Sequence, residues 1–213
     1  MSKLRLQITM SLDGCVAGPE QSEQDPLGIG GMQLHGWAVR LKAFREIHGE
    51  EGGEVNASTP VVEGLFENVG ATVMGRNMFG GGPGDWGDDP WPGWWGENPP
   101  FHHPVFVLTH HPREPLETQG GTTFHFVTDG IESALEQAKA AAGGKDVSLG
   151  GGARAVQQYL AAGLLDEMLI SIVPVLLGGG ARLFDDLGDA SPKLEQVQAI
   201  EAPGVTHIRY RLG

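Results

Sequence analysis

Between residues 123 and 173 the sequence alternates between short apolar runs and helical periodicity, and this pattern limits the fold more than any other feature. The segments 123–127, 146–149 and 167–173 are expected to form strands, and the last of them has a strong apolar run. Residues 131–142 and 153–162 have helical spacing, and glycines follow each of them. Strands that are joined through helices run parallel, with the helices packed on the faces of the sheet.

Further segments extend this sheet at both ends of the chain. Residues 3–10 alternate apolar and polar side chains, and apolar runs at 71–74 and 105–108 predict two more strands. The alternating residues 205–212 are expected to end the sheet with antiparallel pairing. Helices are expected over 37–47 and 59–68. The pattern predicts an α/β fold with a mostly parallel central sheet, antiparallel C-terminal strands and helices on both faces.

A chain of 213 residues is long enough for one hydrophobic core, and we expect a single domain over 1–213. Two insertions, near 19–57 and 80–104, interrupt the pattern of elements. The second has no periodicity and contains five large aromatic residues: Trp86, Trp91, Trp94, Trp95 and Phe101. A loop of this length in a single domain is usually functional or disordered.

The charge balance argues against a nucleic-acid partner. The net charge is −13 and no run of Lys or Arg occurs, whereas nucleic-acid-binding proteins usually present a basic face. Cys15 is the one cysteine, so no intrachain disulfide forms, which fits a reducing cytoplasm. The sequence lacks an apolar signal core and any apolar run of about 18 residues, so neither export nor a membrane span is expected.

The first glycine run (residues 150–152) ends an expected strand and opens an expected helix, in the sequence Leu149-Gly150-Gly151-Gly152-Ala153. Backbone N–H groups without neighbouring side chains, together with the helix dipole, bind pyrophosphate well. A tight glycine turn without a ligand is the alternative. The run also loosely matches the dinucleotide fingerprint of Rossmann proteins, although that motif normally belongs to the first strand–helix unit.

Two other strand ends carry polar groups that suit phosphate. The segment Gly75-Arg76-Asn77-Met78 follows one strand, and Arg76 could bind a 2′-phosphate or serve as a surface ion-pair partner. Leu108-Thr109-His110 follows another. The adjacent histidines at 102–103 and 110–111 are not expected to bind a metal, because neighbouring side chains of an extended segment point to opposite sides and no companion ligands are present.

Taken in order, five short motifs resemble the dihydrofolate reductase-like superfamily. They are SLDG-x-x-A-G at 11–18, MGR at 74–76, LT at 108–109, GGG at 150–152 and PVLLGGGARLF at 174–184. The last motif is typical of the branch that includes the reductase domain of riboflavin biosynthesis, the C-terminal half of the bifunctional deaminase-reductase. The resemblance spans residues 4–184 and implies the three-layer fold of that superfamily.

The resemblance also implies NADPH as the cofactor, lying across the carboxyl edge of the sheet. Ala17 would contact the nicotinamide end, and Gly75, Arg76, Asn77 and Met78 would bind phosphates, with Arg76 at the 2′-phosphate. The strand end at Leu108, Thr109 and His110 would flank the adenine ribose, and Thr128 would lie under the adenine. The residues from Leu149 through Gly150, Gly151 and Gly152 to Ala153 would bind the pyrophosphate. A homodimer is a further implication.

The implied reaction is hydride transfer from NADPH to a C=N or C=O of a small heterocycle, similar to a pteridine or aminopyrimidine, or of a carbonyl compound. Glu63 and Asp13 are the candidate catalytic acids, although an exposed helix carboxylate and a turn-forming aspartate are the alternatives. Trp86 and Trp37 are candidate substrate contacts. For the tryptophan-rich insertion, a dimer contact or loop packing is the alternative. Two other functions stay open, a Rossmann-type dehydrogenase and a non-catalytic ligand-binding member of the same fold.

Overall fold

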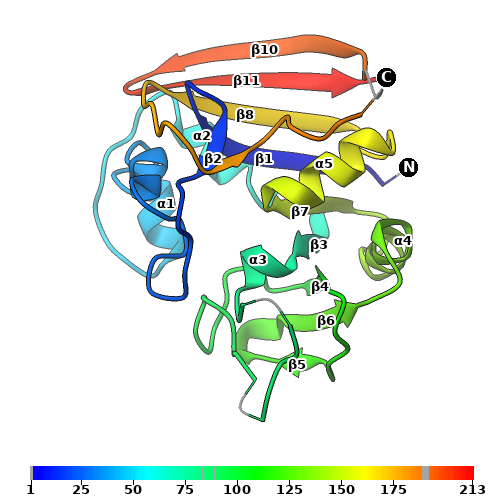
Figure 1. The fold of residues 1–213 in the computed structure, drawn as a ribbon. Helices are drawn as coiled ribbons and strands as arrows, with labels where there is room; N and C mark the ends of the chain where they lie inside the picture. The colour runs from blue at the N-terminus through cyan, green and yellow to red at the C-terminus, as the bar shows by residue number, and fades with distance from the viewer. Residues whose placement is uncertain (1, 83, 89, 189–191) are drawn as a thin grey trace.

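A nine-stranded sheet with the order β10-β11-β8-β1-β7-β3-β4-β6-β5 runs through the molecule (Figure 1). The computed structural model describes residues 2–82, 84–88, 90–188 and 192–213. The strands of this sheet are β1 (Leu4–Ser11), β3 (Val69–Gly75), β4 (Pro104–Leu108), β5 (Leu116–Glu117), β6 (Thr123–Val127), β7 (Asp146–Gly151), β8 (Glu167–Val173), β10 (Leu194–Ala202) and β11 (Val205–Leu212). A separate short pair joins β2 (Cys15–Ala17) to β9 (Ala181–Arg182).

Six neighbouring strands, from β8 through β1, β7, β3 and β4 to β6, are parallel. Their carboxyl ends therefore meet at one edge of the sheet. The strands β5, β10 and β11 pair antiparallel at the two sides. The predicted α/β fold with a mostly parallel sheet and antiparallel C-terminal strands is confirmed.

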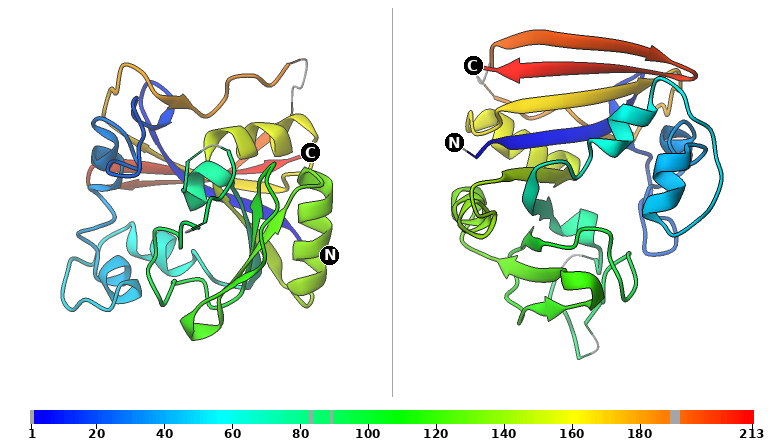
Figure 2. Two further views of the ribbon diagram at one scale, coloured as in Figure 1. Left: turned by 60° about the horizontal axis from the view of Figure 1, so that its bottom comes forward. Right: turned by 180° about the vertical axis from the view of Figure 1, so that it is seen from behind.

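Helices cover both faces of the sheet (Figure 2). The helical elements are η1 (Gly31–His35), α1 (Lys42–Ile47), α2 (Thr59–Glu63), α3 (Arg76–Phe79), η2 (Gln119–Gly121), α4 (Ile131–Ala141) and α5 (Ala153–Ala161). The first face carries α4 and α5 over one continuous apolar core that includes Leu4, Leu6 and the fully buried Tyr159. Among the described residues, no helix has the length and apolar character that crossing a membrane requires.

The second face of the sheet carries two separate cores. One lies under η1, α1 and α2, where Leu34, Leu41 and Val61 pack against β8 and β11. The other lies on β3, β4 and β6, where Phe79 and Phe124 pack with the tryptophan-rich insertion. Each insertion noted in the sequence therefore contributes to covering one part of this face.

The predicted strands at 123–127, 167–173 and 205–212 have the observed bounds, but two predicted helices were too long. The helix expected over 37–47 begins only at Lys42, since residues 36–40 form turns with Trp37 buried. The helix expected over 59–68 ends at Glu63, because Gly64 follows and the chain turns toward β3. Among the described residues of 80–103, no helix or strand occurs, as expected for the second insertion.

Candidate cofactor site

The carboxyl edge of the sheet brings four predicted segments side by side. In the register of the strands, Met74 pairs with Gly151, Gly75 with Leu108, and Leu108 with Val127. The segments that follow β7, β3, β4 and β6 therefore lie in that order along the edge. They carry the first glycine run, Arg76, Thr109 and Thr128. Ligands of open α/β sheets bind at this kind of edge.

The first glycine run is shaped for close approach of a ligand. Gly151 has a φ of 113°, which favours glycine. A Cβ added at Gly152 would meet no atom within 4 Å, so the protein's own packing leaves the space beside it open. Helix α5 begins there with no side-chain hydrogen bond at its N-cap. Its first N–H groups and its dipole are thus available to an anion.

Arg76 lies at the start of α3 with its guanidinium held at the edge. Its Nε and Nη2 donate to the carbonyls of Gly80 (3.2 Å) and Gly81 (3.1 Å), and Nη1 donates to the Thr109 hydroxyl (3.2 Å). Its Cζ lies 3.1 Å from the ring centroid of Trp86. Burial and then the charge of Arg113 lower the pKa of Arg76. Within residues 2–82, 84–88, 90–188 and 192–213, Arg76 forms no ion pair with a carboxylate.

The other predicted phosphate and adenosine contacts differ in exposure. Thr109 is 8% exposed and links Arg76 to the His111 carbonyl, to which its hydroxyl donates at 3.3 Å. Asn77, Met78, His110 and Thr128 have exposed side chains at the same edge. In the described part of the chain, no group of three His, Cys, Asp or Glu side chains gathers as a metal site would require.

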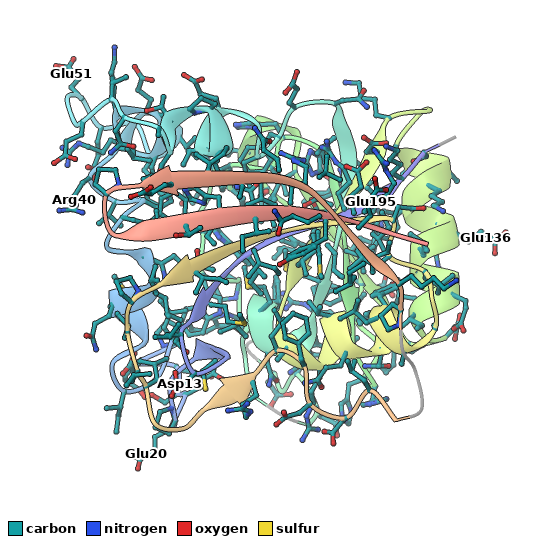
Figure 3. The ribbon with its side chains drawn as sticks, turned by 90° about the horizontal axis from the view of Figure 1, so that it is seen from above. Asp13, Glu20, Arg40, Glu51, Glu136 and Glu195 are labelled. Atoms are coloured by element: carbon teal, nitrogen blue, oxygen red, sulfur yellow. The ribbon has the colours of Figure 1, made fainter. Side chains whose placement is uncertain are left out.

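The turn after β1 is tied to the segment before β9. Asp13 accepts hydrogen bonds from the Ser11 hydroxyl (2.5 Å) and from the backbone N–H groups of Leu177 (3.1 Å) and Gly178 (2.7 Å). These hydrogen bonds, that of Ser11 first, lower the pKa of Asp13 to about 2. Figure 3 shows Asp13 between the two segments. The carboxylate is therefore ionised at neutral pH and holds the turn.

Ala17 lies in β2, where it is 5% exposed and pairs with Ala181. The second glycine run (residues 178–180) passes close by, because a Cβ on Gly180 would come 2.1 Å from the Ala17 carbonyl oxygen. Arg182 of β9 donates to the Asp13 carbonyl at 2.8 Å. Two motifs about 165 residues apart in the sequence thus form one structural unit.

Glu63 and Trp37, the other candidate acid and one of the two candidate aromatic contacts, differ in exposure. Glu63 is exposed at the end of α2, whose buried side chains are Thr59, Val61 and Val62. Trp37 is 8% exposed in the core of the second face. Its indole N–H donates to Thr9 at 3.3 Å.

Beside Trp37 lies His207, a buried imidazole 4.7 Å from the indole between ring centroids. His207 forms hydrogen bonds with the hydroxyls of Ser58 (2.9 Å) and Ser171 (2.7 Å). Burial lowers the pKa of His207 to about 4, so this group is neutral at neutral pH. The network joins the start of α2 to β8 and β11, which is a structural role.

The tryptophan-rich insertion packs on the second face of β4 and β6. Trp95 stacks on Phe124 with centroids 6.0 Å apart, and Trp86 meets Phe126 edge-on at 4.9 Å. These rings pack within the chain, and a substrate contact by Trp86 stays a prediction. Arg113 was not predicted to belong to the site. Its position shortly after the predicted segment 108–110 is a signal in the sequence that could have indicated it. Its Cζ lies 4.8 Å from the centroid of Trp86.

Comparisons with known proteins agree with this architecture. A structure from Shewanella sp. PV-4, named for riboflavin biosynthesis, is 24% identical over 99% of both chains, with a TM-score of 0.65. RibD from Acinetobacter baumannii is 19% identical and has a TM-score of 0.59; all of this chain matches 58% of that one. Dihydrofolate reductase from Enterococcus faecalis, complexed with NADP(H), is 12% identical over 99% of this chain and 96% of that chain, with a TM-score of 0.51.

These likenesses show a shared fold. No curated protein sequence matches the chain. The model of the RibD C-terminal domain family, in contrast, matches residues 2–207, which is nearly the entire length. The ordered motifs, the sheet and this match lead to one conclusion: the chain belongs to the RibD C-terminal domain family.

Proposed function

We propose that the protein is an NADPH-dependent reductase that transfers hydride to a small heterocycle, similar to a pteridine or aminopyrimidine, or to a carbonyl compound. The observation that carries the proposal is Arg76, whose guanidinium forms no ion pair in the described part of the chain and lies at the same sheet edge as the first glycine run. An unpaired cation in a protein of net charge −13 is well explained by an anionic ligand.

The residues at the edge fit the charged parts of NADPH. The first glycine run and the N-terminus of α5 would bind the pyrophosphate, since they offer N–H groups and open space. Arg76 would bind the 2′-phosphate through the two guanidinium N–H groups that its three protein acceptors leave over. Leu108, Thr109, His110 and Thr128 would border the adenosine.

The bound cofactor would supply the hydride, and the protein would position the two reactants and exclude water. Ala17, held between β9 and the second glycine run, would border the nicotinamide. Asp13 is ionised and engaged in holding the turn, and Glu63 is exposed at a helix end. We therefore assign the proton that accompanies the hydride to water rather than to either carboxylate.

The fold argues against one of the two competing functions and leaves the other open. A Rossmann-type dehydrogenase has the strand order 3-2-1-4-5-6 with its glycine motif after the first strand, whereas here the run follows β7. A non-catalytic nucleotide-binding member of the family is the second candidate. The observation in its favour is that Glu63 is exposed at the end of α2 and that the Asp13 carboxylate is engaged in holding a turn.

The test is a titration with NADPH and with NADH, followed by quenching of tryptophan fluorescence, on the natural protein and on Arg76→Gln. We expect tighter binding of NADPH by at least about ten-fold, equivalent to about 1.4 kcal/mol, and loss of most of that preference in the variant. Absence of binding of both nucleotides at millimolar concentration would refute the proposal. Transfer of deuterium from the reactive nicotinamide carbon to an acceptor would separate an enzyme from a binding protein.

The family resemblance also supports a single domain over 1–213 that functions as a cytoplasmic homodimer. Sedimentation equilibrium of the purified chain tests the dimer, since a monomer mass at micromolar concentration would contradict it. Limited proteolysis tests the single domain, because a two-domain chain would yield two stable fragments.

A further inference from the structure

Trp86 is partly buried and contacts protein groups through its ring and its indole N–H. Arg76 stacks at 3.1 Å from its centroid, Phe79 and Phe126 meet it edge-on at 5.7 and 4.9 Å, and its indole N–H donates to the His111 carbonyl at 3.0 Å. A ring that is already stacked on a guanidinium has little surface left for a planar substrate. Its role is better sought in what it does to the arginine.

Arg113 approaches the same indole. Its Cζ lies 4.8 Å from the centroids of both Trp86 and Phe126, and its Nη1 donates to the Trp91 carbonyl at 2.6 Å. Its charge is one cause of the lowered pKa of Arg76, so the two guanidinium groups repel each other. Burial lowers the pKa of Arg113 as well.

The two arginines form no ion pair with a carboxylate among the residues that the structure describes. Asp85, from the same insertion, pairs with His111 at 2.7 Å instead. Holding two partly buried cations near each other costs free energy unless an anion joins them. The arrangement is therefore built for a ligand with concentrated negative charge, and a phosphomonoester dianion is such a group.

We propose that Trp86 and Arg113 determine the preference for the 2′-phosphate of NADPH, an inference that rests on the proposed function. Trp86 is a positioning residue, which orients the Arg76 guanidinium by stacking. Arg113 is a specificity-determining residue, which adds a second positive charge. The tryptophan-rich insertion then selects between NADPH and NADH, and it does not close over the substrate.

Calorimetric titration of the full chain with adenosine 2′,5′-bisphosphate and with 5′-AMP tests the inference, because these ligands differ by one phosphate and calorimetry does not depend on tryptophan emission. We expect Trp86→Leu to lower the preference for the bisphosphate about five-fold and Arg113→Gln to lower it about ten-fold. Trp86→Phe and Arg113→Lys, which keep a ring and a charge, should retain most of the preference. Binding of 5′-AMP should stay unchanged in all four variants.

Two matched controls complete the design. Trp94→Leu removes an indole of the same insertion that contacts Trp91 rather than Arg76, and Arg40→Gln removes an exposed cation beside α1 (Figure 3). Both should keep the natural preference. If Trp86→Leu fails to fold, the two Arg113 variants still test the inference. Unchanged preference in Arg113→Gln and in a folded Trp86 variant would overturn the inference. The proposed function is tested separately on the natural protein, and it fails if that protein binds neither NADPH nor NADH.

Discussion

The chain contains two runs of three glycines, at 150–152 after β7 and at 178–180 before β9, and the structure uses them in opposite ways. Beside Gly152 an added Cβ would meet no protein atom within 4 Å, so the first run leaves a space. At Gly180, the last glycine of the second run, an added Cβ would lie 2.1 Å from the Ala17 carbonyl oxygen, so backbone fills the space at this position. Identical sequence letters thus leave open space, where we propose that a ligand binds, in one place and allow close chain packing in the other.

This difference teaches how a glycine run is to be interpreted. The composition of a glycine run does not show whether it leaves open space or allows close packing. The two cases are distinguished by the atoms that lie where a side chain would be. Substitutions in the two runs should accordingly separate stability from binding, which gives three predictions of decreasing size.

The largest effect is expected at Gly180. Alanine there would collide with the Ala17 carbonyl and would also have to adopt a φ of 117°. Gly180→Ala should lower the free energy of unfolding by about 2–4 kcal/mol, measured by chemical denaturation. Gly179→Ala is the control, because its Cβ would meet nothing within 4 Å, and it should change stability by less than about 1 kcal/mol. Equal stability of the two variants would contradict the close packing of the second run.

Gly152→Ala should have the opposite effect, with little change in stability and a clear loss of NADPH affinity. The backbone φ of Gly152 is −77° and its Cβ would project into open space, so we expect a stability change below about 1 kcal/mol. The added methyl group would lie where the pyrophosphate is proposed to bind, and NADPH affinity should fall at least about ten-fold, or about 1.4 kcal/mol. Calorimetric titration measures this loss. An unaltered affinity would show that the first run is a turn without a ligand.

The smallest effect concerns the hydrogen bonds of the second run with Asp13. The pKa of Asp13 is lowered from 3.8 to about 2, mainly by Ser11 and by the N–H groups of Gly178 and Leu177. A lowered pKa contributes stability that is complete above the unfolded value of 3.8 and is lost as the pH falls toward 2. Asp13→Asn should therefore show a weaker loss of stability over this acid range than the natural protein, measured by denaturation at several pH values. Parallel curves would disprove the role of Asp13.

The local sequence pattern predicted most strands of the sheet. It did not predict the features that depend on contacts between residues distant in the sequence. The runs at 123–127 and 167–173 are buried strands of the expected length, because both are apolar and bounded by polar or glycine residues. Strand β10 was not predicted, since its residues are mostly exposed and a register shift interrupts it between Gln196 and Gln198. The order of strands rests on pairings such as that of Leu4 with Val147, which no local pattern contains.

The outline of the site was also predictable from the local sequence pattern. Segments at the ends of parallel strands necessarily share an edge, so Arg76 and the first glycine run were found from their places in the sequence. The stacking of Arg76 on Trp86 and the approach of Arg113 depend on how an aperiodic insertion packs. Such packing is set by side-chain contacts between distant residues, which no local sequence pattern contains.

The position of β1 in the sheet bears on how the chain comes to be folded. This strand precedes the other strands in the sequence, yet its two sheet partners begin only at Asp146 and Glu167. Contacts between residues so distant in sequence slow folding, and strands whose edges stay unpaired expose the chain to aggregation. A nascent chain that stops short of β8 leaves one edge of β1 bare, together with the apolar side chains of its inner face. The carboxyl edge that carries the first glycine run is thus complete only when β7 has paired with β1 and β3, both of which lie far from it in the sequence.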